Sequence, residues 1–214
     1  MKAIVIGSTG ATGIELINEL IKDSNFTEII TFSRNSLGVN HIKLTEHIID
    51  FNKIKNSKEQ IKGDVLFSAL GTTKKDAGSK KAQYTVDFTY QYEFAKAAND
   101  NGVKTLVLVS SVGANDKSLF FYPKIKGELE KTLKKLDFRN LYIFQPPMLI
   151  RQNDKIRKVE KSGIRIINKL NTFGLLKSQK PISVNLLAKK LIKVCIYQEK
   201  NRIKTYSPKD IFQL

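Results

Sequence analysis

The sequence has few of the residues that build disulfides or metal sites. It contains one cysteine, Cys195, and two histidines, His41 and His47. A single cysteine excludes an intramolecular disulfide and a cysteine-rich zinc site, and two histidines are too few for a histidine-rich site. Because Cys195 lies in an apolar stretch, residues 191–196, we interpret it as a core residue. We therefore expect no metal.

The sequence also lacks a long apolar run. No stretch approaches the ~20 apolar residues that a membrane span requires. The apolar run near the N-terminus stops at Gly7, whereas a signal peptide needs a longer apolar region and a small-residue cleavage site. We therefore expect no membrane span and a cytoplasmic location.

Acidic residues are scarce relative to basic ones. The chain has 37 Lys and Arg against 20 Asp and Glu, a net charge of +17, and residues 151–214 alone hold 16 basic and 4 acidic residues. Such asymmetry occurs in proteins that bind nucleic acids or anionic membranes. However, no basic run exceeds two residues, and aromatic residues are not interleaved with the lysines. We favour a lysine-biased, solvated surface and do not expect a nucleic-acid partner.

The chain is long and apolar enough for one domain. It has 214 residues, of which 41% are hydrophobic, so it can bury a core. Strand-like and helix-like segments alternate, which predicts a parallel sheet with right-handed crossovers. The expected strands cover residues 2–6, 28–33, 64–70, 105–110 and 140–144, with another inside 39–51. The expected helices begin near residue 11 and cover residues 79–101, 123–136, 158–170 and 183–197.

This pattern predicts an α/β fold, a Rossmann doubly wound parallel sheet with a small C-terminal substrate-side extension. The alternation stops after Pro146-Pro147, where residues 151–180 become basic and glycine-punctuated. We see no second core and no linker. We therefore predict a single domain over residues 1–214, with its core in 1–146 and a lid or substrate-side segment in 147–214.

A glycine-rich loop connects the first strand to the first helix. In this context Gly7 permits a tight turn, Gly10 lets the backbone approach a pyrophosphate, and Gly13 allows close packing of helix on strand. The helix N-terminus offers unpaired N–H groups to phosphate, and neighbouring hydroxyls add donors. An NTPase P-loop is excluded because Ile14, not lysine, follows Gly13. The predicted dinucleotide-binding residues of this loop are Gly7, Ser8, Thr9, Gly10, Ala11, Thr12 and Gly13.

The end of the second strand indicates which dinucleotide is bound. An NAD-specific site places Asp or Glu there to hold the ribose 2′-hydroxyl, but this chain has Ser33-Arg34. A guanidinium and a hydroxyl would bind the additional phosphate of NADP, which a carboxylate would repel. We therefore favour NADP(H) over NAD(H).

Two further strand ends supply expected cofactor contacts. Asp50 and Phe51 follow the third strand, where an aspartate can accept from the adenine amino group and an aromatic ring can pack. The fourth strand ends in small residues, so the backbone can pass close to the cofactor and threonine can bind ribose or phosphate. The residues expected to do so are Ala69, Leu70, Gly71 and Thr72.

A serine, a tyrosine and a lysine form the expected catalytic set. Ser110 and Ser111 end the fifth strand, and Tyr122 precedes Lys126 by four residues at a helix start, which puts both on one face. An ammonium near a phenol favours the phenolate, which can exchange a proton with a carbonyl or hydroxyl. We predict Ser111, Tyr122 and Lys126 as catalytic residues, and Ser110, Tyr122 and Lys126 as cofactor contacts.

Together these motifs resemble the atypical short-chain dehydrogenase/reductase family. Within it, the chain is most similar to the group of the Tat-interacting-protein-like oxidoreductases and their bacterial relatives. The similarity runs over residues 1–150 and more weakly to the end of the chain. The residues that carry it are Gly7–Gly13, Ser33-Arg34, Leu70–Thr73, Val86-Asp87, Gly102–Lys104, Val109–Ala114 and Tyr122–Glu128.

The resemblance implies roles for three residues. Ser111 would orient the substrate oxygen, Tyr122 would be the acid/base, and Lys126 would tune Tyr122 and bind the nicotinamide ribose. The segment after Pro146 would help to form the substrate side. The chain departs from the family at Gln145, where relatives often have arginine, and in its short interval between Ser111 and Tyr122.

Several functions remain open from the sequence. The first is an NADP(H)-dependent oxidoreductase acting on a small carbonyl, alcohol or quinone, as a monomer or homodimer. The second is a non-catalytic redox sensor that binds the nucleotide and uses its basic C-terminal third as a partner surface. A nucleic-acid-binding module is the third. An NAD(P)-dependent epimerase or isomerase also remains open, because the same tyrosine and lysine chemistry serves it.

Overall fold

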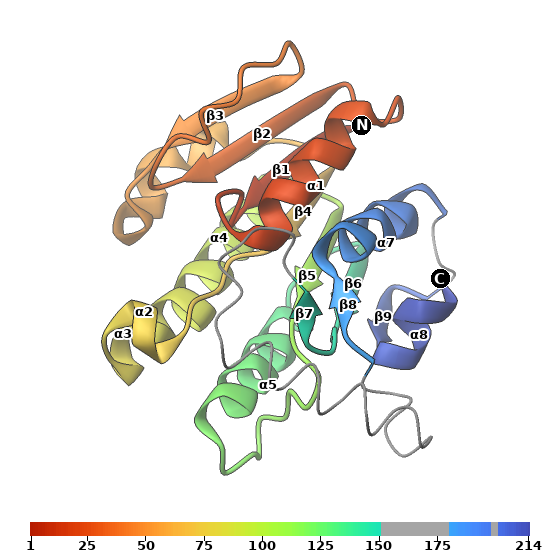
Figure 1. Cartoon of the computed structure of the whole chain (residues 1–214). Helices are drawn as coiled ribbons and strands as arrows, with labels where there is room; N and C mark the ends of the chain where they lie inside the picture. Colours follow the sequence, from red (N-terminus) through yellow and green to blue (C-terminus); the bar gives the residue numbers. More distant parts are fainter. Residues whose placement is uncertain (151–179, 198–200) are drawn as a thin grey trace.

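The computed structural model of the chain describes residues 1–150, 180–197 and 201–214 (Figure 1). The helix expected over residues 158–170 and most of the basic segment 151–180 lie outside these ranges.

A seven-stranded sheet forms the centre of the fold. Its order is β3-β2-β1-β4-β5-β6-β9, and every neighbouring pair is parallel. The order reverses between β1 and β4, which is where open α/β sheets bind ligands, at the carboxyl ends of the strands. A separate parallel pair joins β7 to β8. The strands are β1 (Lys2–Ile6), β2 (Glu28–Ser33), β3 (Leu44–Ile48), β4 (Val65–Ser68), β5 (Thr105–Val109), β6 (Asn140–Phe144), β7 (Leu149–Ile150), β8 (Ile182–Ser183) and β9 (Ile203–Tyr206).

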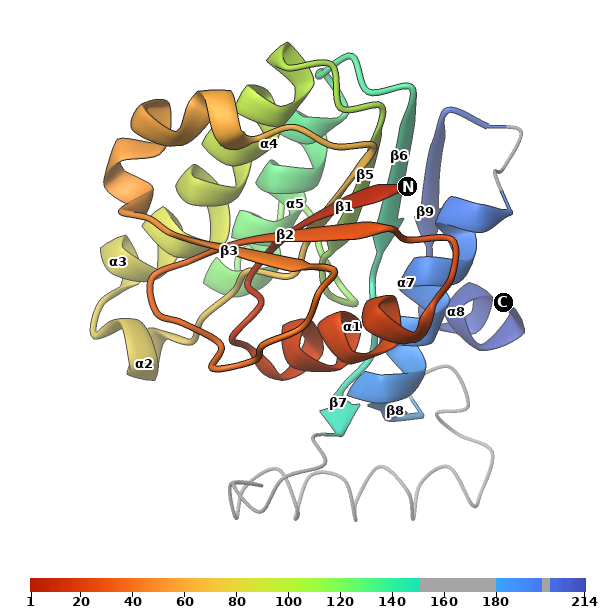
Figure 2. The ribbon, with the colours of Figure 1, turned by 90° about the horizontal axis from the view of Figure 1, so that it is seen from above.

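Helices cover both faces of the sheet, which confirms the expected Rossmann architecture. Figure 2 shows α1 and α7 on one face and α4 and α5 on the other. The helices are α1 (Ala11–Lys22), η1 (Phe51–Gln60), α2 (Lys74–Ala77), α3 (Lys80–Tyr84), η2 (Thr85–Thr89), α4 (Tyr90–Asp100), α5 (Phe121–Leu133), α7 (Val184–Ile196) and α8 (Pro208–Gln213).

Each face of the sheet has its own apolar core. On one face, α1 and α7 bury residues such as Leu16, Leu20 and Leu191. On the other, η1, α4 and α5 bury residues such as Phe94 and Leu129. Because both faces are covered, the central strands are apolar throughout rather than alternating. Burial of apolar surface on both sides of one sheet holds the layers together.

The core also contains the single cysteine. Cys195 is buried in α7, and its thiol donates to the carbonyl oxygen of Leu191. Burial raises the pKa of the Cys195 thiol far above its usual range, which keeps it protonated and unreactive. Among the described residues, no three His, Cys, Asp or Glu side chains gather as metal ligands, and no helix has the length and apolar content of a membrane span.

The segment expected as one long helix over 79–101 is continuous but has a π-helical turn, η2, between α3 and α4. Ser79 caps its start, since its hydroxyl accepts from the Ala82 N–H at 3.0 Å. It ends before Gly102, which has a φ of +81° as expected of a glycine that closes a helix. π turns are frequent at functional sites, and this one carries Asp87.

The final strand is the main element that the sequence analysis missed. β9 pairs with β6 in register from Leu141 opposite Ile203 to Phe144 opposite Tyr206. Phe144 and Tyr206 stack with ring centroids 4.7 Å apart. Residues near the C-terminus therefore complete the same sheet that begins with β1.

Candidate functional site

The glycine loop lies at the point where the strand order reverses. Gly7 has a φ of +81°, and a Cβ added there would lie 2.4 Å from the carbonyl carbon of Ala69. A Cβ at Gly13 would lie 2.1 Å from the carbonyl oxygen of Gly7. Neither position can accept a side chain, because both contacts are with backbone. The loop is therefore held tightly against both α1 and the end of β4.

Gly10 is different, since the nearest atom to an added Cβ is the Gly7 carbonyl oxygen at 3.3 Å. Gly10 is the N-cap of α1, no side chain in the described part of the chain caps that helix, and its first turn has no acidic residue. The buried hydroxyl of Ser8 has no hydrogen-bond partner among the described residues. Unpaired donors at a helix N-terminus suit a phosphate group, so the loop fits a dinucleotide pyrophosphate.

The two residues predicted to bind the 2′-phosphate, at the end of β2 and directly after it, differ in exposure. Ser33 is buried, and its hydroxyl donates to the carbonyl oxygen of Asn35 at 2.6 Å. Arg34 is exposed and forms no ion pair with any described residue. Glu46 holds the following loop, because its carboxylate accepts from the Ser36 hydroxyl at 2.7 Å and the Leu37 N–H at 2.9 Å. Of the two predicted contacts to the 2′-phosphate, Arg34 is thus the one that has no ion-pair partner among the described residues.

A cavity of about 280 Å³ lies beside this loop and the glycine loop. The expected phosphate-binding segment and the residues that follow Arg34 both line this cavity. The adenosine part of a bound dinucleotide would require such a space beside the phosphate-binding loop. Its lining residues are Thr9, Ile14, Ile17, Asn18, Ser36, Leu37 and Val39.

Asp50 and Phe51 have structural partners. The Asp50 carboxylate caps η1 by accepting from the Asn52 N–H at 2.9 Å. Phe51 is buried, with its ring centroid 5.5 Å from that of Tyr90 and 6.3 Å from that of Phe94. The structure therefore places Phe51 in the core between η1 and α4, and its contact with adenine stays a prediction.

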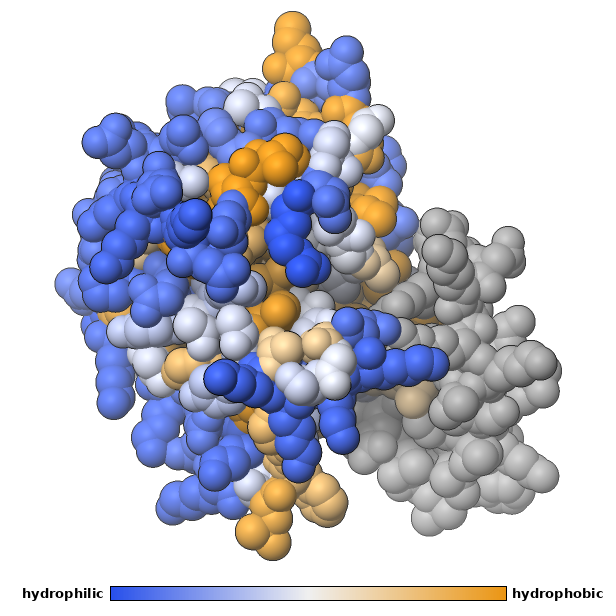
Figure 3. Space-filling model, turned by 90° about the vertical axis from the view of Figure 1, so that its left-hand side faces the viewer, coloured by the Kyte–Doolittle hydropathy of each residue, from blue (hydrophilic) through white to orange (hydrophobic). Residues whose placement is uncertain are grey.

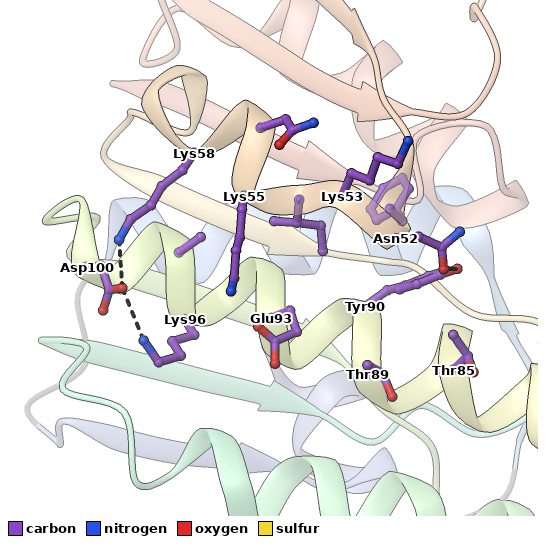
Figure 4. A pocket seen from close by; sticks show the side chains of 14 residues that line it. Asn52, Lys53, Lys55, Lys58, Thr85, Thr89, Tyr90, Glu93, Lys96 and Asp100 are labelled. Atoms are coloured by element: carbon purple, nitrogen blue, oxygen red, sulfur yellow. Dashed lines mark hydrogen bonds and ion pairs between the residues drawn. The ribbon is translucent and has the colours of Figure 1, made fainter.

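A second cavity, of about 840 Å³, lies between η1 and α4 (Figure 4). It shares only Phe51 with the predicted site. Lysines surround it, and two of them, Lys58 and Lys96, share the Asp100 carboxylate at 3.0 and 3.2 Å. This cavity is thus separate from the glycine loop.

The segment after β4 connects the glycine loop to the tyrosine and lysine. Ala69 extends the sheet by donating its N–H to the carbonyl oxygen of Ile6 at 3.0 Å. A Cβ added at Gly71 would lie 3.2 Å from an Asp87 carboxylate oxygen and 3.9 Å from the Lys126 ammonium. The N–H of Thr72 donates to the other Asp87 oxygen at 3.4 Å.

Lys126 is buried and paired with Asp87. Its Nζ lies 3.1 Å from Asp87 Oδ1, and the two side chains are 2% and 0% exposed. The same ammonium lies 5.8 Å from the centroid of the Tyr122 ring, while Tyr122 itself is 39% exposed. The structure brings the predicted tyrosine and lysine together, but it directs the lysine charge to a carboxylate that the sequence analysis did not include in the site.

Ser110 and Ser111 have different hydrogen-bond partners. Ser111 donates its hydroxyl to the neighbouring Val112 carbonyl oxygen at 3.3 Å, and no hydrogen bond between described residues joins it to Tyr122 or Lys126. Ser110 is buried and donates to Glu130 at 2.5 Å. Glu130 also accepts from the Gln145 amide at 3.0 and 3.1 Å. A buried carboxylate with these donors holds the ends of β5 and β6 against α5.

Asp87 and Glu130 are the polar residues that the sequence analysis did not assign to the site. A signal for Asp87 exists, because Asp87, Gln91, Phe94 and Ala98 follow helical spacing on one buried side of the helix. A carboxylate on such a face requires a buried partner. Gln145, which departs from the family pattern, donates its amide to Glu130 and so helps to hold the ends of β5 and β6 against α5.

The sheet order and the glycine loop define a dinucleotide-binding Rossmann fold. Among solved structures, MoeE5 in complex with UDP-glucose and NAD superposes with a TM-score of 0.73 at 14% identity, over 100% of this chain and 80% of that one. A short-chain dehydrogenase/reductase superfamily protein from Agrobacterium tumefaciens with bound NAD gives 0.72 at 13% identity, over 96% and 76%. At such low identity these similarities show the fold alone.

The chain belongs to the NAD(P)H-binding family, whose sequence profile matches residues 7–139. It is 36% identical over 159 residues to "Protein FMP52, mitochondrial" from Debaryomyces hansenii, which covers 72% of this chain and 70% of the yeast protein. Family and fold together confirm the resemblance to atypical short-chain dehydrogenases and support a nicotinamide cofactor. The narrower grouping with the Tat-interacting-protein-like oxidoreductases stays a prediction.

The expected cytoplasmic location is wrong. Relatives from Debaryomyces hansenii, Meyerozyma guilliermondii and Saccharomyces cerevisiae are named as mitochondrial proteins. The cytoplasmic location was inferred from the lack of a long apolar segment, whereas mitochondrial targeting peptides are amphipathic and arginine-rich. The absence of a long apolar run therefore had no bearing on this compartment.

Proposed function

We propose that this protein is an NADP(H)-dependent oxidoreductase that transfers a hydride to or from a small carbonyl compound, alcohol or quinone. The observation that carries the proposal is the short connection between the glycine loop and the Tyr122–Lys126 pair. Gly7 abuts the peptide of Ala69, and Gly71, two residues later, lies against Lys126. A dinucleotide whose pyrophosphate binds the glycine loop can thus extend along the end of β4 toward Tyr122.

Each residue of the set has a distinct role in this proposal. The bound nucleotide supplies or accepts the hydride. Tyr122, which is partly exposed, exchanges a proton with the substrate oxygen. Lys126 holds a positive charge below the Tyr122 ring, and Asp87 fixes its position. Ser111 turns its hydroxyl from the Val112 carbonyl to the substrate oxygen when the substrate binds.

NADP(H) is the proposed form of the cofactor. Arg34 is exposed and unpaired among the described residues, and no carboxylate ends β2. The nearby Glu46 carboxylate is already engaged by the loop at Ser36 and Leu37. These observations support a 2′-phosphate bound by the Arg34 guanidinium.

We expect Arg34→Ala to weaken NADPH binding by roughly tenfold to a hundredfold, because a charged hydrogen bond contributes about 1.5–3 kcal/mol. NADH affinity should stay unchanged. Titration calorimetry with each nucleotide measures both, and Arg139→Ala, another exposed arginine, is the matched control. Equal losses for NADPH and NADH would contradict the NADP preference, and no binding of either nucleotide by the wild type would reject the proposal.

Turnover is tested with Tyr122→Phe. Loss of the acid/base hydroxyl should lower kcat about a hundredfold or more and leave NADPH affinity within about twofold. Stopped-flow or steady-state oxidation of NADPH with a panel of aldehydes, ketones and quinones measures the rate. An unchanged kcat would show that Tyr122 is not the proton donor.

The second candidate is a nucleotide sensor without turnover. The observation that favours it is that the Lys126 charge is paired with Asp87 and the Ser110 hydroxyl is taken by Glu130. This candidate predicts tight NADPH binding together with no oxidation of any substrate in the panel.

A further inference from the structure

The loop between β5 and α5 presents two large apolar side chains to solvent. Leu119 is 100% exposed and Phe120 is 77% exposed. We call these two residues the β5–α5 tip. The face of the molecule in Figure 3 is mostly hydrophilic, and apolar side chains protrude at its lower end, where Figure 1 shows the loop that leads into α5. Adjacent exposed residues of this size mark interaction surfaces more often than isolated ones do.

The tip is held outward by an ordered loop. A Cβ at Gly127 would lie 2.2 Å from the backbone of Asn115 and Asp116, so the missing side chain lets the loop pack directly on α5. Within the loop, the Asn115 N–H donates to the Pro123 carbonyl oxygen at 3.0 Å, and the Phe120 N–H donates to the Ser118 hydroxyl at 3.2 Å. The exposure of Leu119 and Phe120 is therefore built into the fold.

Positive charge surrounds the tip. Lys117 and Lys124 flank it, are exposed, and form no ion pair with any described residue. Lys80 of α3 lies 5.3 Å over the ring of Phe121, which brings a third ammonium to the same end of the molecule. The nearby acidic residue, Asp116, is neutralised by Lys131 at 2.6 Å.

We infer that the β5–α5 tip docks on an anionic lipid surface. Leu119 and Phe120 enter the boundary between headgroups and acyl chains, and Lys117 and Lys124 contact the lipid phosphates and carboxylates. A second copy of this chain is a poor occupant, because it would bring the same cations to the interface. Tyr122 follows Phe120 by two residues, so docking would hold the candidate active site at the membrane surface, where apolar substrates partition.

The test is co-sedimentation of the full chain with vesicles, which does not depend on the proposed oxidoreductase activity. The vesicles contain phosphatidylcholine alone, or phosphatidylcholine and phosphatidylserine in about a 3:1 ratio. We expect the double variant Leu119→Ser/Phe120→Ser to partition at least about tenfold less than the wild type on the mixed vesicles, because it loses the apolar contribution. The matched control is Ile42→Ser, since Ile42 is 98% exposed in the separate loop before β3.

A second pair of variants tests the charge. Lys117→Gln/Lys124→Gln should weaken partitioning onto mixed vesicles by roughly tenfold, whereas Lys134→Gln/Lys135→Gln, exposed just beyond the far end of α5, should have little effect. Added salt should reduce the wild-type partitioning.

Three results would overturn the inference: no sedimentation of the wild type with mixed vesicles, equal loss for Ile42→Ser, or normal partitioning of the tip variant. Sedimentation velocity without lipid adds a fourth. A wild-type dimer that becomes a monomer in the tip variant would assign the tip to a second copy. Thermal unfolding of each variant verifies that these exposed substitutions leave the fold intact.

Discussion

Replacing Asp87 with alanine is expected to destabilise the protein by about 3–5 kcal/mol, because it leaves the Lys126 ammonium buried without a counter-charge. Asp87 is 0% exposed, and one of its oxygens lies 3.1 Å from Lys126 Nζ. In a chain of this size the melting temperature should fall by roughly ten degrees. Thermal unfolding followed by circular dichroism measures the change.

The matched control is Asp100→Ala. Asp100 also pairs with lysines, Lys58 and Lys96, but all three side chains are at the surface (Figure 4). Surface pairs contribute about 0–1 kcal/mol, so this variant should melt close to the wild type. The double variant Asp87→Ala/Lys126→Met, which removes both charges, should recover part of the lost stability. Equal melting temperatures for Asp87→Ala and Asp100→Ala would show that the buried pair is dispensable.

Substitutions in the glycine loop should separate folding from binding. Gly13→Ala puts a Cβ 2.1 Å from the Gly7 carbonyl oxygen, so backbone must move, and we expect a loss of about 3 kcal/mol or more. Gly10→Ala meets only the same oxygen at 3.3 Å, so it should fold with a stability within about 1 kcal/mol of the wild type.

Gly10→Ala should nevertheless bind NADPH at least about tenfold more weakly, because the new methyl group occupies the space where the pyrophosphate approaches the loop. Urea unfolding and titration calorimetry on the two variants separate the effects. Wild-type nucleotide affinity in Gly10→Ala would mean that the cofactor does not cross the loop at this residue.

Much of the fold could be predicted from sequence because parallel strands covered on both faces are continuously apolar. The segments 2–6, 28–33 and 140–144 were expected with their observed bounds, because apolar, aromatic and β-branched residues make up most of each. The strand β9 was not predicted, because Ile203–Tyr206 includes the polar residues Lys204 and Thr205. It lies at the sheet edge, where a polar strand is tolerated. Its place beside β6 depends on a pairing across about sixty residues, which local patterns do not encode.

The site was predictable in part. The motif has glycine wherever the backbone must approach another group closely, so the loop at Gly7, Gly10 and Gly13 could be identified from the sequence. The partner of a buried charge depends on tertiary packing, and η2 and α5 bring Asp87 to Lys126 from 39 positions away in the chain. Ser33 and Ser110 were expected to contact the cofactor. Their hydroxyls instead donate to the Asn35 carbonyl oxygen and to the Glu130 carboxylate.

The late position of α7 and β9 has a consequence for synthesis. The apolar side of α1, with Leu16 and Leu20, packs against α7, whose Leu187 and Leu191 emerge from the ribosome about 170 residues later. Until then the nascent chain carries an uncovered helix face, and the edge of β6 has no neighbour. Vectorial folding of this sheet therefore cannot finish before α7 and β9 are made, and we expect ribosome-bound intermediates to be sensitive to proteases and to need chaperone protection.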